Sequence, residues 1–113
     1  PRAPTLAESD LCTGGLDWAE GAGKQQTVVD LSMRARRMRA FGDFWGYMLV
    51  AQGSLEIMLE FAPLAEWDVA APKMIVREAG GRFTGVDGDP DPRTGSVLAT
   101  NGLVHEELLA LLR

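Results

Sequence analysis

Short strand-like segments alternate with helix-like segments along almost the whole of this 113-residue chain. Apolar residues recur at helical spacing in some stretches and alternate with polar residues in others. The predicted order is strand, helix, strand, helix, strand, helix, strand, strand, helix. Strands that alternate with helices of this length favour a layered α/β sandwich with a mainly parallel sheet. We therefore expect residues 1–113 to form a single α/β domain.

The individual elements follow from the same patterns and from the glycines that interrupt them. We expect helices at residues 25–37, 44–52, 67–81 and 103–112, and strands at residues 4–11, 39–41, 55–59, 82–86 and 96–99. Trp45, Tyr47 and Met48 fit a buried helix, and Cys12 fits a core or loop position. His105 is expected at the surface.

Charge and composition exclude several classes of protein. Sixteen acidic and eleven basic residues give a net charge of -5, which argues against a nucleic-acid-binding surface. No apolar run approaches the roughly 20 residues of a membrane span. The single cysteine excludes an internal disulfide framework and a cysteine-rich zinc site, and it fits a reducing cytoplasm.

Asp68 is the residue whose position most suggests chemistry. It stands directly before the expected helix start, where unpaired N–H groups and the positive end of the helix favour an ionised carboxylate. A fixed carboxylate is a good ligand for Mg²⁺. The alternative is a plain helix cap, worth about 1 kcal/mol. Spacing alone leaves both interpretations open.

Four arginines lie close together, at positions 34, 36, 37 and 39. The first three are typical of a solvated helix end. Arg39 differs because it enters the expected strand that leads to Gly42 and Asp43. An arginine in that place can hold a carboxylate or phosphate through two hydrogen bonds.

Two stretches resemble a known family. Residues 60–81, EFAPLAEWDVAAPKMIVREAGG, resemble the C-terminal signature of the inositol monophosphatase family. Residues 39–53, RAFGDFWGYMLVAQG, are similar to the bacterial histidinol-phosphatase branch, in which a Gly-Asp-Phe-Trp type sequence opens a helix. Inositol phosphatases tend to have Gly-Ser-Ala or Gly-Thr-Ala there. The closing residues 99–102, ATNG, also fit the family.

The resemblance implies the C-terminal half of the inositol-monophosphatase-like fold and a Mg²⁺-dependent phosphomonoesterase. By position in the motifs, Asp68 would be a metal ligand and catalytic residue that also touches the substrate. Gly42, Asp43 and Glu60 would line the alcohol side of the pocket, and Arg39 would join the substrate site. The implied substrate is histidinol phosphate, in the histidine biosynthesis of a cytoplasmic enzyme, and the family's tendency to dimerise implies a homodimer.

The chain departs from the family in lacking two N-terminal motifs, a Glu-Glu pair and an Asp-Pro-Ile-Asp-Gly-Thr type sequence. The string DGDPDP at residues 87–92 shares only composition with the second motif, and we expect a solvated loop there. One carboxylate cannot hold a catalytic pair of Mg²⁺ ions, so these residues alone should be inactive. The alternatives are an inositol or sugar phosphate phosphatase of the same family, and a non-catalytic α/β binding module.

Overall fold

The computed structural model describes residues 5–14, 23–40, 43–61, 66–92 and 96–112. The strands are β1 Asp10–Thr13, β2 Arg37–Ala40, β3 Ile57–Glu60, β4 Arg82–Gly85 and β5 Val97–Thr100. The helices are α2 Gln25–Arg34, α3 Asp43–Ala51, α4 Glu66–Glu78 and α5 His105–Leu112, preceded by a 3₁₀ turn, η1 Leu6–Glu8. The predicted order of strands and helices is therefore confirmed. Within these ranges no helix is both long and apolar enough to cross a membrane.

The five described strands form one sheet in the order β2-β1-β3-β5-β4. β1 pairs in parallel with β2 and with β3, whereas β5 runs antiparallel to both β3 and β4. Only β5 among these strands is reversed, because it follows β4 through a connection that contains no helix in its described part. The layered α/β fold is confirmed, and its sheet is mixed.

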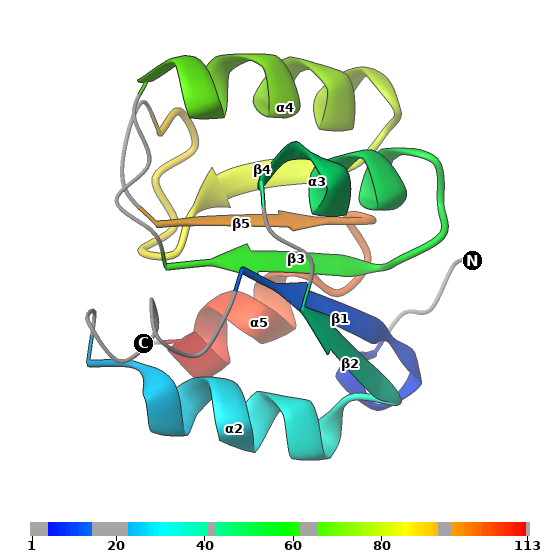
Figure 1. The fold of residues 1–113 in the computed structure, drawn as a ribbon, viewed down its shortest axis with the longest axis vertical. Coiled ribbons are helices and arrows are strands. Elements are labelled where there is room, and N and C mark those ends of the chain that lie inside the picture. Colours follow the sequence, from blue (N-terminus) through cyan, green and yellow to red (C-terminus); the bar gives the residue numbers. More distant parts are fainter. Residues whose placement is uncertain (1–4, 15–22, 41–42, 62–65, 93–95, 113) are drawn as a thin grey trace.

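Helices cover both faces of this sheet, as Figure 1 shows, with α3 and α4 on one side and α2 and α5 on the other. Alternate residues of each strand enter the two layers because successive side chains of a strand point to opposite faces. In β3, Ile57 and Leu59 join the core beneath α2 and α5, whereas Met58 joins the core beneath α3 and α4. The central strand thus holds both layers together.

Element boundaries differ from the sequence prediction at several ends. β1 begins at Asp10 rather than near residue 4, because the residues before it form the 3₁₀ turn. α2 ends at Arg34, so Arg37 and Arg39 belong to an edge strand instead of a helix end or strand entrance. Asn101 delays the last helix, since its side chain accepts hydrogen bonds from the N–H groups of residues 103 and 104.

Two predicted exposures were wrong. Trp45 is 57 % exposed on α3, although its helical segment is largely apolar. His105, expected at the surface, is fully buried between β4, β5 and the start of α5. Its Nε2 lies 2.8 Å from the Thr84 hydroxyl and its Nδ1 lies 2.9 Å from the Thr100 hydroxyl.

The partners of the two hydroxyls assign the tautomer of His105. Thr84 donates its proton to the carbonyl of Gly85, so it accepts from Nε2–H. Thr100 accepts from the N–H of Gly102 and donates to Nδ1. A neutral imidazole therefore satisfies every polar atom of this cluster. Burial, aided by the charge of Arg82, lowers the pKa of His105 to about 4.

Acid should lower the stability of the folded protein because of His105. An unfolded histidine has a pKa of about 6.5. Below that pH the unfolded chain binds a proton at this position, whereas the folded chain does not. The contribution of neutral His105 to the free energy of unfolding is fully present above about pH 6.5 and is lost as the pH falls through about 4. It amounts to about 3 kcal/mol. Urea unfolding between pH 7 and 4 should show His105→Gln losing less stability on acidification than the parent. Equal losses in the two proteins would contradict this role for His105.

Candidate active site

The carboxyl ends of β1, β2 and β3 lie at one edge of the sheet, because these three strands are parallel. α3 and α4 both begin at this edge, directly downstream of β2 and β3. In α/β proteins ligands bind in the crevice outside the carboxyl ends of parallel strands. This edge is therefore the place where side chains for chemistry are expected.

A buried pair of side chains occupies this edge. Glu60, the last residue of β3, is 4 % exposed, and Tyr47 of α3 is 2 % exposed. The phenol of Tyr47 donates a hydrogen bond to Oε1 of Glu60. Because hydrogen bonds to ionised acceptors are stronger than neutral ones, this contact fixes the direction of the Glu60 carboxylate.

The surroundings of Tyr47 are apolar and negatively charged. Burial raises the pKa of the Tyr47 phenol far above its usual range, and the neighbouring charges of Glu60 and Asp68 raise it further. The phenol therefore remains protonated and acts as a donor. Its ring packs against Phe83 at a centroid distance of 5.7 Å.

Two glycines allow the backbone to approach this pair. A Cβ atom on Gly14, just after β1, would lie 3.0 Å from Oε2 of Glu60. A Cβ atom on Gly46 would lie 2.4 Å from Sδ of Met58 and 3.3 Å from Sγ of Cys12. Gly46 thus lets α3 lie close to the sheet, which brings its neighbour Tyr47 within reach of Glu60.

The structure brings together only part of the predicted site. Glu60 and Asp68 both act on the phenol of Tyr47. Asp68 lies within the first turn of α4, which begins at Glu66, so the prediction that it is the N-cap was wrong. Asp68 still belongs to the turn where a negative charge interacts favourably with the helix dipole.

The other predicted site residues are less well defined. Gly42 lies outside the described residues, and so does the side chain of Asp43, whose backbone begins α3. Arg39 is exposed on the edge strand β2, opposite Cys12 in register. It lines a separate open groove together with Arg37 and Trp45.

Tyr47 is the site residue that sequence reasoning missed. Its apolar neighbours suggested an ordinary core position in the helix. A signal was present, because Asp43 and Tyr47 are four residues apart and positions i and i+4 share one face of a helix. A phenol on the same face as a candidate substrate-binding residue marks a polar contact that a core position does not require.

Two further ion pairs involve residues outside the predicted site. Arg36 pairs with Asp10 at 2.9 Å, and Lys73 pairs with Asp91 at 2.6 Å in the polar loop after β4. The described part of that loop is largely exposed and turns on its own Asp side chains, which confirms the expected solvated loop. No group of three or more acidic, histidine or cysteine side chains that could hold a metal ion occurs in the described part of the chain.

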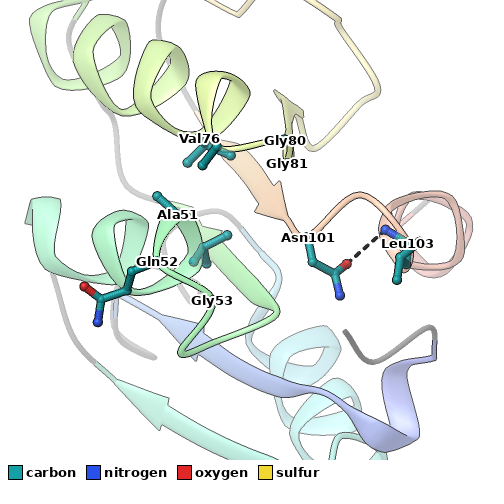
Figure 2. Close-up of a pocket in the computed structure, with 10 residues that line it drawn as sticks. Ala51, Gln52, Gly53, Val76, Gly80, Gly81, Asn101 and Leu103 are labelled. Atoms are coloured by element: carbon teal, nitrogen blue, oxygen red, sulfur yellow. Dashed lines mark hydrogen bonds between the residues drawn. The ribbon is translucent and has the colours of Figure 1, made fainter. Parts of the chain in front are cut away.

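A cavity of about 340 Å³ opens at the opposite edge of the sheet, where α3 and α4 end (Figure 2). Its lining is mostly small or apolar and includes Gly53, Gly80, Gly81 and Val76. Asn101 also lines it, but its Oδ1 accepts the N–H of Leu103, as the dashed line in Figure 2 shows. The ten lining residues include no acid, base or thiol, so this cavity lacks groups for acid–base or nucleophilic chemistry.

Comparison with known proteins identifies relatives over nearly the whole chain. The profile of the inositol monophosphatase family matches residues 15–113. A histidinol-phosphatase from Streptomyces coelicolor is 44 % identical over 108 residues, covering 96 % of this chain and 40 % of that protein. A histidinol-phosphatase from Mycobacterium tuberculosis is 45 % identical over 95 residues, covering 84 % of this chain and 36 % of that protein. The chain therefore spans well under half the length of these relatives.

Solved structures show the same fold. The inositol monophosphatase from Anabaena superposes with a TM-score of 0.85 at 30 % identity, covering 99 % of this chain and 46 % of that structure. An inositol monophosphatase from Zymomonas mobilis superposes with a TM-score of 0.88 at 24 % identity, covering 99 % and 45 %.

Gly46 provides a test of how the edge is assembled. Gly46→Ala improves helix propensity by about 1 kcal/mol, yet its Cβ would collide with the fully buried side chain of Met58. We expect a net loss of about 1–3 kcal/mol, as for other overpacked cores, measured by urea unfolding. In a Met58→Ala background the same change should cost less, because the colliding sulfur is gone. Equal costs in the two backgrounds would contradict the close approach.

Proposed function

The chain belongs to the inositol monophosphatase family, and from that premise we propose that it is part of a histidinol-phosphate phosphatase. Phosphatases of this family act on small phosphorylated substrates. We propose that the reaction is hydrolysis of histidinol phosphate to histidinol and phosphate, in histidine biosynthesis. Residues 1–113 would be a single α/β domain that forms the C-terminal portion of the enzyme.

The observation that carries this proposal is the negative character of the edge around Tyr47. Glu60 is buried there with its carboxylate fixed, and the charge of Asp68 reaches the same phenol. Histidinol carries an ammonium group and an imidazole, whereas inositol is a neutral polyol. Anionic groups next to the reacting phosphate ester therefore favour the cationic alcohol. The two relatives named histidinol-phosphatase support the same choice.

The proposed roles follow the positions in the fold. Glu60 and Asp43 would orient the alcohol side of the substrate, with Gly42 providing the backbone turn that leads to Asp43. Arg39 would act at the margin of the site, because it is exposed on the edge strand. Asp68 would contact both the substrate and a metal ion.

Members of this family are generally metal-dependent. The described residues do not by themselves form a metal site. We propose that Asp68 is this chain's ligand to Mg²⁺ and that residues outside these 113 complete the set. On this proposal the chain alone is inactive and binds Mg²⁺ only weakly, because hard cations need several oxygen ligands.

We further propose a cytoplasmic homodimer. The single cysteine supports a reducing compartment. Five large apolar side chains besides Trp45 are exposed on the described surface, which supports contact with further protein: Val29, Met33, Met74, Ile75 and Leu103.

Substrate preference tests the proposal directly. The full-length enzyme should release phosphate from histidinol phosphate with a higher kcat/KM than from inositol phosphate. Asp43→Asn should lower that preference by about 10-fold or more, the size of a lost charge-assisted hydrogen bond, and leave metal affinity unchanged. A preference for inositol phosphate would instead support the second candidate, to which a relative from Synechocystis named inositol-1-monophosphatase, 56 % identical over 43 residues, points. Hydrolysis of neither ester would leave a non-catalytic α/β module.

Asp68→Asn tests the metal assignment. The substitution keeps the size of the side chain and removes its charge, so the loss of the helix-dipole interaction should cost less than about 1 kcal/mol. Turnover in the full-length enzyme should fall by at least about 100-fold, because metal-ion charge stabilisation contributes several kcal/mol. Thermal stabilisation by added Mg²⁺ should fall in parallel. Near-normal turnover together with unchanged Mg²⁺ stabilisation would reduce Asp68 to a residue that only stabilises the helix.

A further inference from the structure

Tyr47 links the packing of α3 to the chemistry of the carboxyl edge. Its ring belongs to the apolar core beneath α3 and α4 and contacts Phe83. Its hydroxyl, in contrast, reaches the carboxylate of Glu60. A phenylalanine would fill the same core volume, so the hydroxyl is the part of this side chain that packing does not explain.

The carboxylate of Glu60 requires such a partner. A buried ionised group is costly unless it is hydrogen-bonded and its charge is compensated. Tyr47 donates to Oε1, while Oε2 lies on the side of Gly14, where a Cβ would approach to 3.0 Å. The side chain is thereby confined between the phenol and the backbone after β1, and it cannot rotate freely.

A neutral donor also leaves the charge of the site intact. A lysine or arginine at position 47 would cancel the charge of Glu60, whereas a phenol stabilises the carboxylate and adds no positive charge. The phenol therefore adds no positive charge beside Glu60, and the charge of Asp68 acts on the same phenol. A positively charged group on the substrate would be attracted to such a carboxylate.

We propose that Tyr47 is a positioning residue for substrate selection, holding the Glu60 carboxylate so that it receives the ammonium or imidazolium group of a cationic phosphate ester. This inference rests on the proposed function and adds to it the residue that keeps Glu60 in place. Tyr47 acts through Glu60 and does not itself touch the substrate.

The test compares two esters on four forms of the full-length enzyme. The forms are the parent, Tyr47→Phe, Glu60→Gln and the double variant, and the esters are histidinol phosphate and inositol phosphate. Tyr47→Phe should raise KM for histidinol phosphate by about 10-fold, the lower end of the effect of losing a hydrogen bond to a charged group. Its kcat, and the KM for inositol phosphate, should change little. The double variant should be no worse than Glu60→Gln alone, because Tyr47 then has no carboxylate to position.

Thr84→Val is the matched control. It also removes a buried, hydrogen-bonded hydroxyl, but on the face of the sheet that carries α5. It should lower stability and leave the ratio of the two KM values unchanged. An unchanged ratio in Tyr47→Phe, or fully additive effects of Tyr47→Phe and Glu60→Gln, would overturn the inference.

Two further outcomes are decisive. If Tyr47→Phe fails to fold, the double variant should fold again, because it no longer buries a carboxylate that has lost its phenol donor. Failure of both would assign Tyr47 to packing alone and reject the inference. If the parent prefers inositol phosphate, the proposed substrate is wrong. In that case coupling between Tyr47→Phe and Glu60→Gln on inositol phosphate would retain the positioning role, and its absence would reject it.

Discussion

The hydrogen bond from Tyr47 to Glu60 is the contact on which the functional edge depends. It requires that α3 lie close to the sheet, which Gly46 permits. It also requires that β3 end near the start of α3. Phe83 supports the ring from β4. Removing any of these supports would leave a buried carboxylate without its donor, which costs more than the hydrogen bond itself contributes.

The two side-chain layers of the domain contain different polar clusters. They are separate because successive side chains of each strand point to opposite faces of the sheet. Beneath α3 and α4, the layer holds the polar pair and continues to the carboxyl edge. Beneath α2 and α5, the layer is apolar except near its end, where His105 joins β4, β5 and α5 through two threonine hydroxyls. Both clusters are buried and hydrogen-bonded, but only the first contains a carboxyl group. The histidine cluster therefore fixes the arrangement of elements, and we propose that the glutamate cluster belongs to the substrate site.

Local patterns could predict the order of the elements because the change between helical and strand periodicity depends only on neighbouring residues. They could not predict which helix face meets the sheet, and so Trp45 and His105 were assigned to the wrong environments. The start of α4 at Glu66 was missed as well, because the apolar pattern begins only after it. Family motifs indicated Glu60 and Asp68, and in the structure both lie near the phenol of Tyr47. The contact of Tyr47 itself with Glu60 was found from the structure. The reversal of β5 was foreseeable, since a connection without a helix joins neighbouring strands as an antiparallel hairpin.

The charge at the carboxyl edge also bears on how the phosphate group of the proposed substrate could be bound. On the proposed function, Glu60 and Asp68 would favour a cationic alcohol, but the same two carboxylates would repel the phosphate group that the alcohol carries. A phosphate dianion can lie beside them only if positive charge intervenes. A metal ion held partly by Asp68 would supply that charge and would screen the phosphate from Glu60. On the proposed function, recognition of the alcohol and neutralisation of the phosphate are thus separate tasks, and we propose that Glu60 takes part in the first.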